Sequence, residues 1–147
     1  MPTPLTANFT LEELVASKTA NDRGINNQPS DDVIAALRQT ADLLEKIRSL
    51  LGNRPMTITS GYRCLDLNRA LGSKDDSDHI KGLAADFVCP GFGSPPAICQ
   101  AIAASPIEFR QLIDESNSAG DQWVHIAAGT GRQLLTINAN GVRFGLG

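Results

Sequence analysis

The sequence predicts an α+β protein in which helices come first and an antiparallel sheet follows. Apolar residues recur at helical spacing through the first third of the chain. The later part alternates short apolar or β-branched runs with turns that contain Gly, Asn or Pro. The 147 residues and 41% hydrophobic content suffice for one core. We therefore expect a single domain over residues 1–147, with an N-terminal helical part at about 10–52.

Two helix-start signals define the N-terminal part. Thr10 and Glu13 form a capping-box pattern, which predicts a short helix. Residues 20–29 contain Asn, Asp, Gly and Pro, and they predict an irregular connection. Ser30 precedes two aspartates and a long run of apolar residues at helical spacing. This pattern predicts a structural helix of about 20 residues.

The sheet is expected from β-branched and apolar runs bounded by turn residues. These runs lie at residues 56–60, 84–88, 108–115, 123–128 and 133–138. A short helix over 65–71 separates the first two runs, and Ser94 begins another helix after the second. A turn joins the third and fourth runs, which predicts a hairpin that packs against the helices.

Composition and charge exclude several classes of partner. The net charge of −3 gives no overall attraction to nucleic acid, and no apolar run approaches a membrane span. The first residues lack the basic start and apolar core of a signal peptide, so we expect synthesis in the cytoplasm without an export signal. Three cysteines without a CxxC pattern indicate small buried thiols. We expect a monomer.

The two histidines and one unusual aspartate form a candidate metal site. Asp86 lies inside an apolar strand, where a carboxylate needs a partner or a metal. His125 lies in a second strand, on the face opposite Val124 and Ile126. With His79 they make a three-ligand set that leaves a fourth position open, as in catalytic zinc sites. From spacing alone, three unrelated polar residues are an equally good interpretation.

An ordered series of motifs decides between these interpretations. It consists of Ser60-Gly61-Tyr62-Arg63, Leu67-Asn68, Ser77-x-His79-x-x-Gly82-x-Ala84-Ala85-Asp86 and Trp123-Val124-His125. The series resembles the zinc D-alanyl-D-alanine carboxypeptidase and L-alanyl-D-glutamate endopeptidase family, and most closely its small phage and prophage members. This family has the fold shared with hedgehog signalling domains. The resemblance runs from Phe9 to Ile126.

The resemblance implies roles for several residues. His79, Asp86 and His125 would bind Zn²⁺, which suits imidazole and carboxylate ligands. Arg63 matches the family arginine that binds substrate and stabilises the developing oxyanion. Ser77 would orient His79 or contact substrate, with a turn-forming serine as an equal alternative. For Trp123 the choice lies between a wall of the substrate groove and core packing, and core packing is narrowly favoured.

The general base departs from the family pattern. Many members carry Glu or Asp three residues before the last histidine, where this chain has Gln122, which cannot accept a proton at neutral pH. Two nearby acids remain. Glu115 is expected to face His125 across the hairpin, as a glutamate does in hedgehog domains, and it is favoured. Asp121 is adjacent to Gln122 but should point to the other side of a regular strand.

The resemblance implies a zinc metallopeptidase that hydrolyses the peptide stems of bacterial peptidoglycan, as a carboxypeptidase or as an endopeptidase. It would act at the cell wall after phage-type release, as an endolysin does, or as part of a virion. The alternative is a non-catalytic zinc domain that binds cell-wall peptide or a phage structural partner. The general base discriminates between the two.

Overall fold

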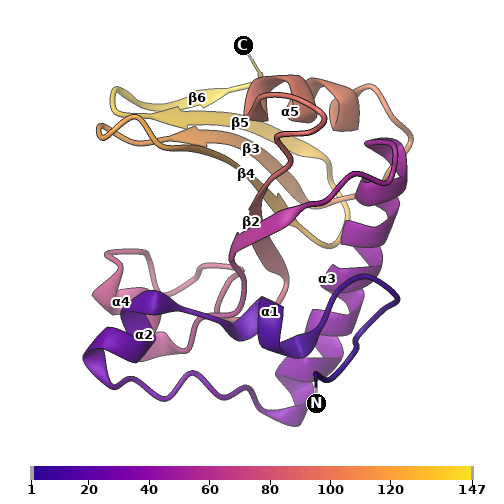
Figure 1. Cartoon of the computed structure of the whole chain (residues 1–147). Coiled ribbons are helices and arrows are strands. Elements are labelled where there is room, and N and C mark those ends of the chain that lie inside the picture. Colours follow the sequence, from indigo (N-terminus) through magenta and orange to yellow (C-terminus); the bar gives the residue numbers. More distant parts are fainter. Residues whose placement is uncertain (1, 147) are drawn as a thin grey trace.

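The computed structural model describes residues 2–146 and contains helices and one mixed sheet. The helices are α1 (Leu11–Val15), α2 (Lys18–Arg23), α3 (Asp31–Leu50), α4 (Leu65–Ala70) and α5 (Pro95–Ala103). The strands are β1 (Thr57–Ser60), β2 (Ala84–Val88), β3 (Gln111–Ser116), β4 (Gln122–Ala127), β5 (Gln133–Asn138) and β6 (Gly141–Phe144). The α+β class is confirmed, with the small helices α1, α2 and α4 grouped away from β5 and β6 (Figure 1).

The sheet has the strand order β1-β2-β4-β3-β5-β6. All neighbours are antiparallel except β3 and β5, which are parallel. The expectation of an antiparallel sheet is therefore right for four of the five pairings. The exception has a physical reason. β4 already has β2 and β3 on its two sides, and β5 pairs with the remaining edge of β3. Because the chain reverses direction after β4, β5 runs in the same direction as β3.

One face of the sheet packs against α3 and α5, and the other carries the candidate site. Phe87, Leu112, Val124 and Ile126 point to the packed face and are fully buried. They share one hydrophobic core with apolar residues of α3 and α5. Since side chains alternate along a strand, the residues between them point to the opposite face. These include Asp86 and His125.

The local helix signals are confirmed. The Thr10 side chain accepts from the Glu13 amide, and the Glu13 carboxylate accepts from the Thr10 amide, which completes the capping box. Ser30 caps α3, whose length matches the expectation. The irregular connection expected at 20–29 is partly wrong because α2 occupies its start. The Ser17 side chain caps α2, and Gly24 ends it in a left-handed conformation.

Two glycines connect the site segment to the helices. A Cβ atom at Gly61 would lie 2.2 Å from the Leu14 carbonyl oxygen, so only glycine allows the backbones of α1 and β1 to approach this closely. Gly82 has φ +74, and a Cβ there would press on Val33 of α3. Its carbonyl oxygen accepts a hydrogen bond of 2.6 Å from the buried Thr40 hydroxyl. The segment between these glycines is therefore held against the helices at both ends.

Candidate metal centre

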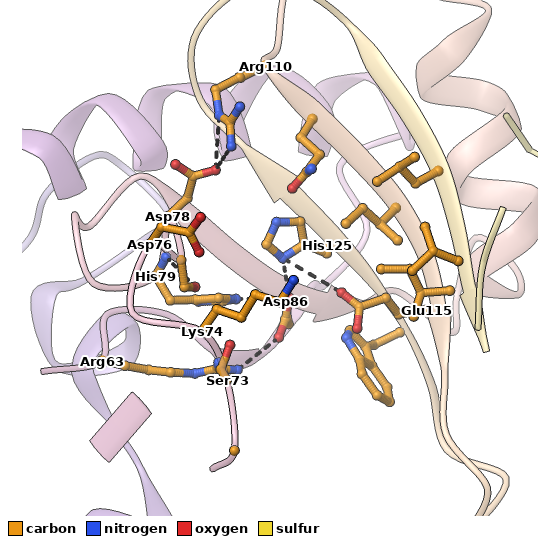
Figure 2. Close-up of a pocket in the computed structure, with 18 residues that line it drawn as sticks. Arg63, Ser73, Lys74, Asp76, Asp78, His79, Asp86, Arg110, Glu115 and His125 are labelled. Atoms are coloured by element: carbon orange, nitrogen blue, oxygen red, sulfur yellow. Dashed lines mark hydrogen bonds and ion pairs between the residues drawn. The ribbon is translucent and has the colours of Figure 1, made fainter. Parts of the chain in front are cut away.

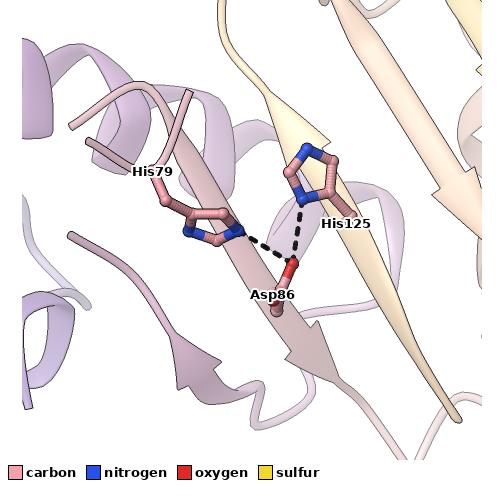
Figure 3. Close-up of side chains that lie close together, drawn as sticks. All are labelled: His79, Asp86 and His125. Carbon is pink, nitrogen blue, oxygen red and sulfur yellow. Dashed lines mark hydrogen bonds and ion pairs between the residues drawn. The ribbon is translucent and has the colours of Figure 1, made fainter. Parts of the chain in front are cut away.

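His79, Asp86 and His125 come together at the centre of the site face (Figure 3). Asp86 lies on β2, and its register partner is His125 on β4. His79 comes from the turn before β2. Oδ1 of Asp86 lies 3.0 Å from Nδ1 of His125 and 3.4 Å from Nε2 of His79. All three residues are buried. Sheet pairing thus positions two members of the cluster, and a loop positions the third.

One ring nitrogen of each histidine faces the Asp86 carboxylate. His79 Nδ1 lies 2.7 Å from the Gly61 carbonyl oxygen, and a carbonyl only accepts, so Nδ1 carries the proton. His79 Nε2 therefore has a free lone pair on the side of Asp86. His125 presents Nδ1 to Asp86, while its Nε2 is buried without a hydrogen-bond partner among the described residues.

The charges of the cluster are coupled. Burial by itself would raise the pKa of Asp86, but His79 and His125 hold that pKa well below its usual range. Burial lowers the pKa of His125, whereas the hydrogen bond and negative charge of Asp86 raise it, and the net direction is upward. Asp86 is thus held as a carboxylate, the form that ligates metal.

The donor set fits a zinc ion. Zinc–nitrogen and zinc–oxygen bonds of about 2.0–2.2 Å in a tetrahedron place ligand atoms roughly 3.3 Å apart. The distances of 3.0 and 3.4 Å from the Asp86 oxygen to the two ring nitrogens bracket that value, and all three candidate ligand atoms lie within 4.8 Å of one another. The Gly61 carbonyl oxygen, which accepts a hydrogen bond from Nδ1 of His79, is the kind of outer partner that metal-binding histidines have.

Arg63 lies beside the cluster and is fixed by neutral and charged acceptors. Its Nε donates to the Ser60 hydroxyl at 3.0 Å, and Nη1 donates to the Asn68 amide oxygen at 3.3 Å. Nη2 lies 3.5 Å from Oδ2 of Asp86. A guanidinium has five N–H groups, so these contacts leave up to two for another ligand. Arg63 can therefore hold a carboxylate or an oxyanion without moving.

Glu115 and Asp121 lie in different surroundings. Glu115 lines the pocket, with its carboxylate 3.9 Å from Nδ1 of His125. Burial and the charge of Asp86 raise the pKa of Glu115, against the opposing effect of His125 and Arg63. Asp121 is exposed in the turn between β3 and β4, where it accepts from the Asn117 side chain. It does not belong to the residues that line the pocket.

The register of the hairpin differs from the expected one. His125 pairs with Ile113, while Glu115 pairs with Trp123, two positions further along. Glu115 thus approaches His125 diagonally on the same face and not directly across the hairpin. Gln122, at the position where the family often has an acid, is exposed and pairs with Ser116.

The pocket of about 570 Å³ has two unlike walls (Figure 2). We call Arg63 and residues 72–78 the loop wall, which presents charged and hydroxyl groups. We call the strand residues Ile113, Trp123, Leu135, Ile137 and Val142 the apolar wall. His79, Asp86, His125 and Glu115 lie between the walls. Ser77, on the loop wall, accepts a hydrogen bond from the His79 amide. Trp123 is half-buried, and its indole Nε1 has no partner among the described residues.

Three residues that support the site carry no signal in the sequence. Asn27 donates to the carbonyl oxygens of Val15 and Tyr62 and accepts from the Cys64 amide, so it holds the backbone on both sides of Arg63. Asp78 is buried beside His79. Its Oδ2 accepts hydrogen bonds from the Arg110 guanidinium, one of them from Nε at 3.0 Å. Residues 12 to 37 positions apart form these contacts, which no local pattern reveals.

Comparison with known proteins identifies the class of protein. The sequence profile of the peptidase M15 family matches residues 7–127. The chain therefore belongs to the peptidase M15 family, which confirms the resemblance found in its motifs. The matched part ends with β4, so β5 and β6 lie outside it.

The zinc D-Ala-D-Ala carboxypeptidase of Streptomyces albus G is similar to this chain. The two are 30% identical over 89 residues, which is 60% of this chain and 34% of that protein. The chain thus spans about a third of the length of this relative. In residues 2–146, no helix is long and apolar enough to cross a membrane.

Proposed function

We propose that this protein is a zinc-dependent peptidase and that His79, Asp86 and His125 hold the metal. One observation carries the proposal: the three ligand atoms converge within 4.8 Å beside a pocket that also contains an acid and an arginine. Membership in the peptidase M15 family supports it. Zinc in this position would supply a Lewis acid that polarises the scissile carbonyl and activates water.

The residues around the cluster have separate roles in this proposal. Glu115 accepts the proton of the attacking water, because its carboxylate lies in the pocket within one water of the cluster. The N–H groups of Arg63 that remain available bind the oxygen on which negative charge develops. Ser77 orients the backbone of His79, and Trp123 walls the groove beside Glu115.

We further propose that the substrate is a peptide stem of bacterial peptidoglycan, and that the protein acts as a cell-wall enzyme of the phage endolysin type. Two observations support this. The motifs resemble peptidases of that substrate class, and the similar Streptomyces protein is a zinc D-Ala-D-Ala carboxypeptidase. The pocket of about 570 Å³ has room for part of a peptide, and Arg63 of its loop wall can bind a substrate carboxylate.

Digestion of purified peptidoglycan tests this function. The zinc-loaded protein is incubated with the wall polymer, and the released stems are analysed by mass spectrometry. Release of a terminal alanine alone would identify a carboxypeptidase, whereas cleavage within the stem would identify an endopeptidase. Binding of the stems without any release would contradict peptidase activity and would favour the non-catalytic zinc domain.

A further inference from the structure

Beyond the His79, Asp86 and His125 cluster, the site face of the sheet carries mainly apolar side chains. Register pairs His125 with Ile113, Ile113 with Leu135, and Leu135 with Phe144. Residues paired across strands point to the same face of a sheet. A row of side chains therefore leads from the cluster on β4 across β3 and β5 to the edge strand β6.

A second row lies beside the first. It connects Trp123 to Glu115, Ile137 and Val142. Apart from Glu115, no residue of these two rows beyond β4 is charged. Arg143, the charged residue of β6, falls between Val142 and Phe144 and pairs with Thr136, so it points to the opposite face. The rows thus make one apolar strip beside Glu115, in which Ile113 and Leu135 are buried at the pocket floor and Val142 and Phe144 are exposed.

The outer end of this surface is exposed. Val142 is 63% exposed and Phe144 is 83% exposed, more than the other exposed large apolar side chains of the described residues. Neither contributes to the core, which lies on the other face. A contiguous apolar patch that extends a polar groove is typical of a binding surface. The family match does not include this part of the chain, because it ends at residue 127.

We propose that the apolar wall, extended by Phe144, binds an aliphatic stretch of the peptide substrate on one side of the scissile bond. This inference rests on the proposed peptidase function. Three strand spacings of about 4.8 Å separate β4 from β6, a path of roughly 14 Å. An extended peptide advances about 3.3 Å per residue, so about four residues cover this path. The surface therefore fits an endopeptidase that engages several residues beside the cleaved bond.

The test is a length series of fluorescent peptides. Each carries the same stem sequence, extended on either side by zero, two or four alanine or serine residues. Binding is measured by fluorescence anisotropy with zinc-loaded Glu115→Gln protein, and cleavage with the unmodified protein. We expect the four-alanine extension on one side to bind about tenfold more tightly than the unextended peptide. The four-serine extension should give little gain.

The variants V142S and F144S, singly and together, should remove most of this tenfold gain. F144S alone should also leave binding of the unextended peptide unchanged, because Phe144 lies outside the pocket lining. L50S is the matched control, since Leu50 is an exposed leucine of α3, 38% accessible and far from the groove in sequence and fold. Thermal melting followed by circular dichroism establishes that each variant is folded. The single variants keep the test informative if the double variant does not fold.

The outcomes separate the two proposals. Affinity independent of extension length, or unchanged by V142S and F144S, would overturn the substrate surface. Extension-dependent binding without cleavage by the unmodified protein would remove the peptidase function and leave the peptide-binding surface intact. If ultracentrifugation shows a dimer that V142S and F144S dissociate, and peptide binding does not respond to them, the surface is an interface between two copies and the proposal is wrong.

Discussion

The two walls of the groove are built by different kinds of interaction. The loop wall depends on single side-chain contacts: Asn27 to the backbone around Arg63, Asn68 to the Lys74 carbonyl, and Thr40 to Gly82. The apolar wall depends on the backbone ladders between β3, β4, β5 and β6, which do not require particular side chains. One substitution can therefore displace the loop wall, whereas the apolar wall should tolerate changes that alter only its surface.

The largest effect is expected at the cluster, where the two walls meet. His125→Ala removes one of the three proposed ligands and keeps the backbone hydrogen bonds of the β4 ladder. We expect metal binding to fall from about one zinc per chain to a small fraction, with loss of turnover. Zinc content after dialysis, measured by atomic emission, checks this result. Full zinc occupancy in the variant would contradict the ligand assignment.

Glu115→Gln tests whether Glu115, which lies beside the apolar wall on β3, is the general base. The amide keeps the shape of the side chain but cannot accept a proton, so we expect kcat to fall about 10²–10⁴-fold while zinc stays bound. Peptide cleavage and zinc content are measured on the same sample. Asp121→Asn is the matched control and should retain nearly full activity, since Asp121 lies outside the pocket lining. The reverse result would transfer the role to Asp121.

Asn27→Ala tests the loop wall from a distance. The substitution removes two hydrogen bonds to the backbone on either side of Arg63, at the Tyr62 carbonyl and the Cys64 amide, and a third to the Val15 carbonyl of α1. We expect a loss of stability of about 1–3 kcal/mol and a fall in kcat/KM of about tenfold, because Arg63 is displaced.

Zinc content separates positioning from general unfolding in this variant. Asn27→Ala should keep its zinc, because neither strand ligand contacts Asn27. Loss of zinc together with loss of activity would show that Asn27 supports the whole centre. Asn21→Ala, at an exposed position of α2, is the matched control.

The smallest effect is expected at Thr40. Thr40→Val keeps the side-chain shape and removes the 2.6 Å hydrogen bond to the Gly82 carbonyl. We expect a loss of about 1–2 kcal/mol in the free energy of unfolding, measured by urea denaturation, with activity nearly retained. Thr57→Val, at an exposed position of β1, should change stability by less than about 0.5 kcal/mol. Equal losses of unfolding free energy at both positions would show that the hydrogen bond to Gly82 has no particular importance for stability.

Local patterns predicted much of this fold and the members of its cluster. The capping box at Thr10 and the long helix after Ser30 depend on residues a few positions apart, and both are present. The two faces of β4 also followed from alternation, since Val124 and Ile126 are in the core.

What the sequence alone determined is therefore the type of most elements, although not of α2 or β6, the side from which Asp86 and His125 project, and the family whose motifs they form. Tertiary structure alone decided the parallel pairing of β5 with β3, the diagonal approach of Glu115 to His125, and the contacts of Asn27 and Arg110. The reason is physical. Helix caps and strand alternation are set within a few residues, whereas strand neighbours and register depend on which edges are free once the rest of the chain has packed.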